Sequence, residues 1–341
     1  MKDQMLIIKA RGNRMSIYDK TPNRKEIARR IENFRLAGGG ELDLSRLYMT
    51  EIPVEISGLK NLTCLNLSYN QLKALPDWLG NIRSLKKLNL RGNSIDVLPD
   101  AIGELKGLVF LDIGVNWFLK TGECLKQLGS LEYLDLESVD FKMNILPDWI
   151  GSLSSLQFLN LRNCGLKSLP ESMKNLSGLR TLCLGANCLA TLPEWLGGFS
   201  ALEKLDISAN ELFIIPEFIG NLKNLTALDL GHSGEWENRT VHHTISSLDW
   251  QINRLDKLPD FLTGLTRLTR LNLGHTALKS LPDSLRALRL ESLKINNNEL
   301  TEFPEWLGTM TSLKELDLSE NGEIRCLPKA WAVSVTLRSL I

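Results

Sequence analysis

The chain has 341 residues, and its 40 Lys and Arg balance its 40 Asp and Glu, so no overall charge favours binding to nucleic acid. No apolar run approaches the roughly 18 residues that a membrane span needs, and the apolar residues 5–8 are too few for the core of a signal peptide. The six cysteines are scattered, which is typical of reduced thiols in the cytoplasm rather than of a disulfide framework.

Residues 1–40 are predicted to form a basic segment and a capping helix. Residues 1–36 carry ten Lys or Arg against four Asp or Glu. Ile27, Ile31 and Phe34 fall on one helical face within residues 23–37, and this face would cover the core at the first repeat. Three glycines at 38–40 end the helix. Contact with acidic lipid or nucleic acid is the alternative role for the basic segment, but its mixed charges favour a solvated cap.

One pattern returns through residues 41–341, at steps that are mostly 23 residues long. LNLSYNQLKALPDWLGNIRSLKK from Leu65 and LNLRGNSIDVLPDAIGELKGLVF from Leu88 are successive copies. The LxL segment alternates apolar and polar residues, which predicts short strands with inward leucines that stack into one parallel sheet. An Asn follows the strand and would bond the backbone of adjacent turns. This Asn recurs at positions 70, 93, 116, 187, 210, 253, 298 and 321.

Proline marks the other side of each repeat. Eleven of the twelve prolines share one repeat position, and nine of these are followed directly by Asp or Glu. Proline suits the start of a helical turn, and an acid just after it faces the positive end of that turn. The sequence therefore predicts short helical or 3-10 turns on the outer side. Trp78, Trp149, Trp195 and Trp306 recur in the same register, so we expect them to pack there rather than to bind a ligand.

The pattern LxxLxLxxNxLxxLPxxLGxL resembles that of the leucine-rich-repeat family, in the 23-residue type common in bacterial proteins and intracellular scaffolds. The resemblance implies an α/β solenoid: a horseshoe with a concave parallel β-sheet and short helical or 3-10 turns on the convex side. It also implies a protein-binding role without identifying the partner.

Two stretches depart from the pattern. The unit at 111–133 lacks the Leu-Pro pair, and the step from Leu228 to Leu271 is 43 residues. This step is either one unit with a twenty-residue insertion or two units. Because Leu248 and Asn253 fall on repeat positions, we expect a degenerate unit at 228–247 followed by a regular one. The array would then hold about 13 repeats, with an inner sheet about 60 Å long at roughly 4.8 Å per strand.

No catalytic motif accompanies the repeats. The sequence lacks GxxxxGK[ST], GxSxG, HExxH and CxxC, so we predict no enzyme activity, no cofactor and no small-molecule substrate. His232 and His275 share one repeat position, and two predicted strands of separation would place them about 10 Å apart. That distance is too long for one metal ion, so we predict no metal site.

A partner would bind where outward side chains leave the repeat pattern. Phe110, Tyr133 and Phe158 precede the inward leucines of three successive strands and would lie about 4.8 Å apart on the concave face. Aromatic and Arg side chains are enriched at binding hot spots. The predicted partner-binding residues are Phe110, Tyr133, Phe158, Tyr69, Lys87, Arg91, Arg162 and Glu137. The alternative is that the three rings only cover one another.

Trp236, His242 and His243 form a secondary candidate site, because interruptions of a solenoid often form binding loops. The sequence therefore predicts a non-catalytic scaffold that binds a partner protein on its concave face in the cytoplasm, with no nucleic-acid partner. Two alternatives stay open: a secreted bacterial effector that binds a host protein inside a host cell, and the recognition part of a longer multidomain protein.

Overall fold

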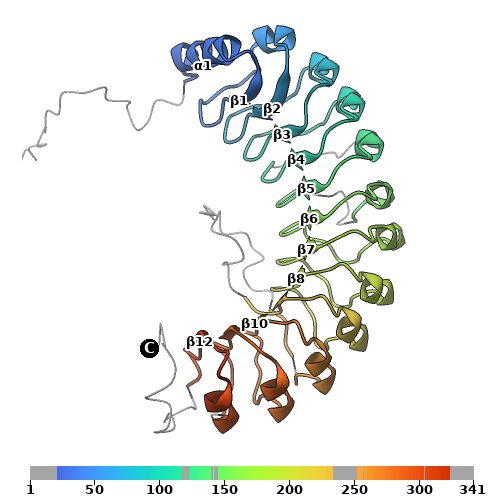
Figure 1. Cartoon of the computed structure of the whole chain (residues 1–341), viewed down its shortest axis with the longest axis vertical. Coiled ribbons are helices and arrows are strands. Elements are labelled where there is room, and N and C mark those ends of the chain that lie inside the picture. The colour runs from blue at the N-terminus through green and yellow to red at the C-terminus, as the bar shows by residue number, and fades with distance from the viewer. Residues whose placement is uncertain are drawn as a thin grey trace, which may run out of the picture.

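The computed structural model describes residues 21–116, 123–139, 141, 145–232, 252–255, 257–302 and 304–322. The described elements trace an arc that begins with the helix α1 (Arg24–Leu36) and ends with the strand β12 (Glu315–Asp317). Strands line the inner side of this arc and short helical turns line its outer side (Figure 1). The predicted solenoid with a concave sheet is confirmed.

Twelve described strands form one parallel sheet in which each strand pairs with the next along the chain. They are β1 (Gly40–Asp43), β2 (Leu62–Asn66), β3 (Lys87–Asn89), β4 (Phe110–Asp112), β5 (Tyr133–Asp135), β6 (Phe158–Asn160), β7 (Thr181–Cys183), β8 (Lys204–Asp206), β9 (Ala227–Asp229), β10 (Arg270–Asn272), β11 (Ser292–Lys294) and β12. Their central leucines are aligned, as Leu65 is with Leu88 and Leu88 with Leu111. These leucines are fully buried, so each repeat closes the core of its neighbour.

The outer side consists of 3-10 turns, as the prolines predict. They are η1 (Val54–Gly58), η2 (Asp77–Asn81), η3 (Asp100–Glu104), η4 (Glu123–Gln127), η6 (Asp148–Ser152), η7 (Glu171–Asn175), η8 (Glu194–Gly198), η9 (Glu217–Asn221), η10 (Asp260–Gly264), η11 (Asp283–Ala287) and η12 (Glu305–Thr309). In η2, the Pro76 carbonyl accepts a hydrogen bond of 3.0 Å from the Leu79 amide, which closes the first turn. Trp78, Trp195 and Trp306 pack against the core and Trp149 is buried, which confirms their packing role.

The helix α1 covers the first repeat. Ile27, Ile31 and Phe34 are buried, as their helical spacing predicts. Asn23 caps the helix by accepting a hydrogen bond from the Glu26 amide at 3.2 Å. Gly39 has a φ of +129°, and a Cβ there would lie 2.5 Å from the Cβ of Asn61, so only glycine fits this turn.

The recurring Asn side chains form a buried ladder. Asn70 donates from Nδ2 to the carbonyls of Leu44 and Leu67, at 2.9 and 2.8 Å. Its Oδ1 accepts from the amides of Leu47 and Met49, both at 3.0 Å. One side chain therefore satisfies four backbone groups that the bend after the strand would leave unpaired.

The prediction of a separate unit starting at Leu248 is wrong. β9 pairs directly with β10, and Leu228 is the register partner of Leu271. Asn253 occupies the ladder position of the unit that starts at Leu228, because its Nδ2 donates to the Leu230 carbonyl at 2.7 Å and its Oδ1 accepts from the Leu212 amide at 3.1 Å. The extra twenty residues are therefore an insertion between a strand and its Asn, and Leu248 lies outside the described residues.

Candidate functional site

Three aromatic side chains form a stack on the concave face. Phe110, Tyr133 and Phe158 are neighbours in the registers of β4, β5 and β6. The ring centroids of Phe110 and Tyr133 lie 4.2 Å apart, with an angle of 15° between the planes. Those of Tyr133 and Phe158 lie 4.1 Å apart at 2°. All three residues are half-buried. These three residues are called the concave aromatic stack below.

The stack follows from the spacing of the strands. Parallel strands lie about 4.8 Å apart, which is close to the distance between two aromatic rings in face contact. The same outward position on successive strands therefore brings ring planes together. The rings do cover one another, yet each keeps part of its surface open to solvent. Tyr133 has both faces covered, so its ring offers a partner only its edge.

Arg91 lies just after the C-terminal end of β3 and is buried rather than on the open surface. Its side chain is 7% exposed, and its guanidinium forms ion pairs with Asp135 at 3.4 Å, Asp112 at 3.7 Å and Glu137. Burial alone would lower the pKa of Arg91, but these carboxylates outweigh burial and raise that pKa. The guanidinium is therefore held as a permanent internal cation.

A glycine makes room for this arrangement. Arg91 belongs to the repeat of β3 and reaches carboxylates in the repeat of β5, so its side chain crosses the repeat between them. At the crossing point stands Gly114, where an added Cβ would lie 2.7 Å from Nη1 of Arg91. We call Arg91, Gly114 and the carboxylates of Asp112, Asp135 and Glu137 the Arg91 crossing.

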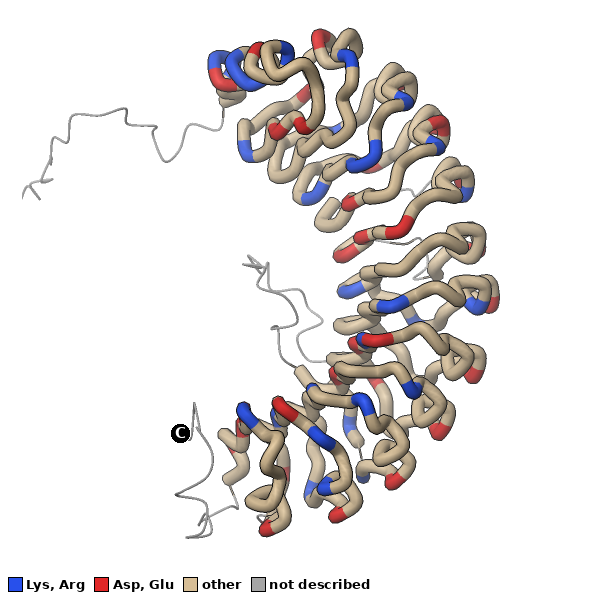
Figure 2. Tube along the Cα trace, in the orientation of Figure 1, with Lys and Arg blue, Asp and Glu red and all other residues tan. Residues whose placement is uncertain are grey.

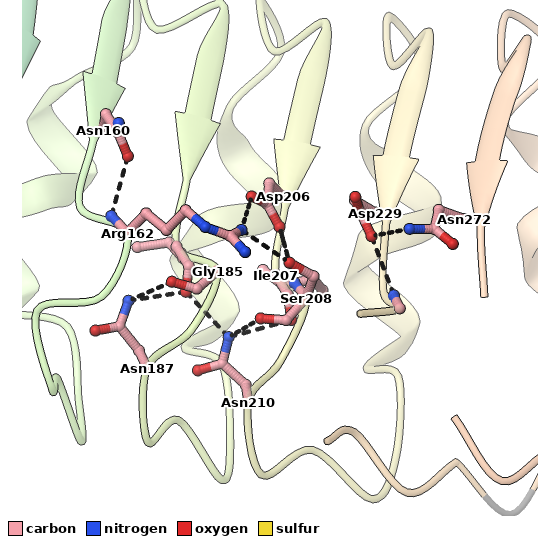
Figure 3. Close-up of polar contacts among 12 residues, drawn as sticks. Asn160, Arg162, Gly185, Asn187, Asp206, Ile207, Ser208, Asn210, Asp229 and Asn272 are labelled. Atoms are coloured by element: carbon pink, nitrogen blue, oxygen red, sulfur yellow. Dashed lines mark hydrogen bonds and ion pairs between the residues drawn. The ribbon is translucent and has the colours of Figure 1, made fainter. Parts of the chain in front are cut away.

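Arg162 repeats the arrangement further along the sheet. Its Nη1 lies 3.0 Å from Oδ2 of Asp206 and donates to Oγ of Ser208 at 3.2 Å (Figure 3). The side chain again passes over a glycine, Gly185, at which a Cβ would collide with the guanidinium. Burial lowers the pKa of Arg162, while Asp206 and Asp229 raise it and prevail. Arg162, Gly185, Asp206 and Ser208 form the Arg162 crossing.

Asp229 stands one strand beyond that crossing and is fully buried. Its Oδ1 accepts hydrogen bonds from Nδ2 of Asn272 at 2.8 Å and from the Gly231 amide at 3.1 Å (Figure 3). Its Oδ2 is buried without a hydrogen-bond partner. Burial and the nearby charge of Asp206 raise the pKa of Asp229 well above its usual value, so folding favours the neutral form of this carboxyl.

The remaining predicted residues divide between surface and interior. Lys87 is exposed and is the register neighbour of Phe110, so it extends the surface of the concave aromatic stack by one strand. Tyr69 is 41% exposed, and the Arg46 guanidinium carbon lies 4.3 Å from its ring centroid. Arg91 and Glu137 form an ion pair with each other, and their predicted role in partner binding stays a prediction.

The secondary candidate residues Trp236, His242 and His243 lie outside the described residues, so their binding role stays a prediction. His232 and His275 lie on neighbouring repeats, with ring centroids 5.6 Å apart, which corrects the expected separation of about 10 Å. Burial lowers the pKa of His275. In the described part of the chain, no three His, Cys, Asp or Glu side chains are grouped to hold a metal ion.

Two features of the surface escaped the sequence prediction. Lys204 and Arg270 occupy the same outward position as the stack, on β8 and β10, and following the strand register to the end of the array finds them. Phe213 and Ile214 are 60% and 74% exposed at a position where other repeats carry pairs such as Lys73–Ala74. That contrast is also visible in the sequence.

Among the described residues, no helix combines the length and apolar character needed to cross a bilayer. The described cysteines, at positions 64, 124, 164, 183 and 188, form no disulfide with one another. Burial raises the pKa of Cys164, whose Sγ contacts the Leu136 carbonyl at 3.2 Å in a position that Asn fills elsewhere. This thiol is a packing residue of the ladder and not a nucleophile.

The chain shares sequence features and architecture with known repeat proteins. Family models described as leucine-rich repeat region, leucine rich repeat and Leucine Rich Repeat match residues 119–252, 40–95 and 289–310. No curated protein matches the sequence. Among solved structures, a leucine-rich-repeat protein of Leptospira interrogans is 30% identical with a TM-score of 0.67, and the match covers 84% of this chain and 75% of that one.

Two further structures are similar in fold. An internalin of Listeria monocytogenes is 20% identical with a TM-score of 0.66, over 82% of this chain and 73% of that one. A plant peptide hormone receptor, solved in complex with RGF2, is 27% identical with a TM-score of 0.61, over 82% of this chain and 42% of that one. From the repeat motif, the parallel sheet and the Leptospira match, the chain belongs to the leucine-rich-repeat family.

Proposed function

We propose that the chain is a non-catalytic scaffold that binds a partner protein on its concave face, with the concave aromatic stack at the centre of the contact. The single observation that carries the proposal is this stack of three half-exposed rings on consecutive strands. Aromatic side chains dominate the energetics of protein interfaces, and burying the part of each ring that is still exposed would contribute about 1 kcal/mol.

The setting of the rings supports binding. Each ring is held by its neighbour, so little side-chain freedom is lost when a partner covers the stack. At the C-terminal ends of the same strands, the Arg91 crossing joins three successive repeats through ion pairs and holds these strands in place. Rigid support of this kind keeps a binding surface in one geometry.

The architecture is also compatible with binding a second chain, since the similar plant receptor was solved in complex with RGF2. We further propose that the scaffold acts in the cytoplasm, because its described cysteines form no disulfide with one another, as is typical of a reducing compartment. An exported effector is the rival, and export of the chain with and without residues 1–20 separates the two.

Affinity capture tests the proposal. The bait proteins are the wild type, the triple variant F110A/Y133A/F158A and a control, F213A/I214A, which removes exposed apolar side chains from another surface. We expect a protein that the wild type and the control retain and the triple variant loses, with melting temperatures within a few degrees. Capture of the same proteins by all three baits contradicts the proposal, and a large fall in melting temperature of the triple variant assigns the rings to stability.

A further inference from the structure

One line of outward positions on the concave face carries charges of a single sign through the middle of the array. These positions directly precede the inward leucine of each strand and include the concave aromatic stack. Among the described strands, the line bears the cations Lys87 on β3, Lys204 on β8 and Arg270 on β10. Its acids stand near the two ends, Glu41 on β1 and Glu315 on β12. We call Lys87, the stack, Lys204 and Arg270 the basic-aromatic line.

These three cations are available to a partner. In the described part of the chain, none of them forms an ion pair, whereas Arg91 and Arg162 are paired with carboxylates. Lys87 and Arg270 are exposed and Lys204 is half-buried. Around the arc as a whole, acidic and basic residues are interspersed (Figure 2). The line is therefore a local positive surface on a chain with no net charge.

The register sets the distances between the cations. Lys87 and Lys204 are five strands apart, which is about 24 Å, and Lys204 and Arg270 are two strands apart, about 10 Å. An extended peptide rises about 3.4 Å per residue, so these gaps correspond to roughly seven and three peptide residues. The stack lies within the longer gap.

We propose that the partner presents an acidic, extended segment that lies across the strands along the basic-aromatic line. One carboxylate of the segment meets Lys87, a second about seven residues away meets Lys204, and a third about three residues further meets Arg270. Apolar side chains between the first two acids cover the concave aromatic stack. This inference rests on the proposed function and adds the chemistry of the partner.

Cations beside aromatic rings also occur in sites for single-stranded nucleic acid, but the geometry here disfavours that ligand. Bases bind by stacking on open ring faces, and both faces of Tyr133 are covered by Phe110 and Phe158. Glu132, next to Tyr133, is exposed and has no ion-pair partner among the described residues. A phosphate backbone passing over the stack would meet this carboxylate.

Selection from a displayed library of random 16-residue peptides tests the proposal on four immobilised proteins. They are the wild type, the charge reversal K87E/K204E/R270E, the stack variant F110A/Y133A/F158A, and a control, K60E/K73E/K167E. The control reverses three exposed lysines elsewhere, so it changes the net charge equally. A fluorescent oligouridylate of 20 nucleotides is titrated against the same proteins, and melting temperatures verify folding.

The wild type and the control should enrich peptides with Asp or Glu at the spacings above and apolar residues between them. K87E/K204E/R270E should bind the best of these peptides about tenfold or more weakly and should enrich peptides with Lys or Arg instead. Peptides that need the stack but show no acid preference overturn this inference and leave the proposed function standing. Peptides that bind F110A/Y133A/F158A as tightly as the wild type, or a selection that enriches no peptide, count against both this inference and the proposed function. If oligouridylate binds the wild type more tightly than the best peptide does, and K87E/K204E/R270E loses this binding, the ligand is a single-stranded nucleic acid rather than a peptide.

Discussion

The Arg91 crossing and the Arg162 crossing are built alike and end differently. In each, an arginine passes over a glycine of the next repeat and reaches a carboxylate two strands away. Arg91 meets three carboxylates and its side chain is 7% exposed, whereas Arg162 meets one carboxylate and a hydroxyl and is 22% exposed. The next carboxylate, Asp229, is left with an oxygen that has no hydrogen-bond partner.

The difference shows how a buried row of acids is tolerated in a repeat protein. The repeat places Asp or Asn after the first strand leucine again and again, and a carboxylate there is stable only when a cation or donors reach it. Arg91 forms ion pairs with Asp112, Asp135 and Glu137. Arg162 forms its ion pair with Asp206, and burial of Asp229 on the next strand raises the pKa of that carboxyl.

Removal of the two arginines should give the largest effect and separate the crossings. Arg91→Met keeps the bulk of the side chain but leaves three carboxylates without their cation, so we expect the free energy of unfolding to fall by about 3–5 kcal/mol. Arg162→Met should lower it by only about 1–2 kcal/mol, because its site is more open and has fewer acids. Urea denaturation at pH 7 measures both. Equal losses in the two variants would show that the number of neighbouring carboxylates does not determine how much each arginine contributes to the free energy of unfolding.

Filling the space under each guanidinium should have a smaller effect. Gly114→Ala places a Cβ 2.7 Å from Nη1 of an enclosed arginine, and we expect a loss of about 1–3 kcal/mol. Gly185→Ala should lose at least as much, because a Cβ there would lie within 3 Å of the buried Ser208 and Asp206 side chains as well as of Arg162. Gly129→Ala is the control because a Cβ there meets nothing within 4 Å. If Gly114→Ala matched this control in thermal and urea unfolding, the glycine would not be required for the crossing.

Asp229→Asn should raise stability at pH 7, by about 1 kcal/mol, while Asp206→Asn should lower it by removing the partner of Arg162. The raised pKa of Asp229 means that the unfolded chain releases its proton first, near pH 3.9, so the wild type loses stability as pH rises above that value. The gain from Asp229→Asn is thus expected to be absent at pH 3 and present at pH 7. Urea unfolding at both pH values measures it, and a gain that is equal at both would refute the assignment.

Salt should produce the smallest effect. The contribution of Arg162, defined as the stability difference between wild type and Arg162→Met, should shrink by about 0.5 kcal/mol between 0.05 and 1 M NaCl, because partly exposed charges are screened. The same difference for Arg91→Met should stay constant. A contribution of Arg91 that falls as steeply as that of Arg162 would show that water reaches the inner crossing.

The repeat pattern was sufficient to predict the sheet, the outer turns, the Asn ladder and the cap, because each of these depends on residues within one or two repeats. It also placed Phe110, Tyr133 and Phe158 on adjacent strands. The pattern failed where a contact skips a repeat. The residues of a single repeat do not show that Arg91 reaches Glu137 or that Arg162 reaches Asp206. The sequence feature that accompanies each contact is a glycine in the repeat that the arginine crosses, Gly114 or Gly185.

The long step between β9 and β10 misled the repeat count for a different reason. Leu248 and Asn253 have the spacing of a strand and its ladder residue, and spacing alone cannot tell which strand an Asn serves. Hydrogen bonds from Asn253 to the carbonyls of Ile207 and Leu230 decide the question. The hydrogen bonds of the Asn side chain, rather than the sequence spacing, therefore show to which repeat Asn253 belongs.

That Asn253 closes its unit after a twenty-residue detour has a consequence for engineering. The ladder requires the Asn253 side chain at its position, and the segment between the strand and this Asn can be long, since the entropic cost of closing a loop grows only slowly with its length. The junction between His232 and Ile252 is therefore a natural graft point. A foreign loop of chosen length inserted there should leave the alignment of Leu228 with Leu271 unchanged.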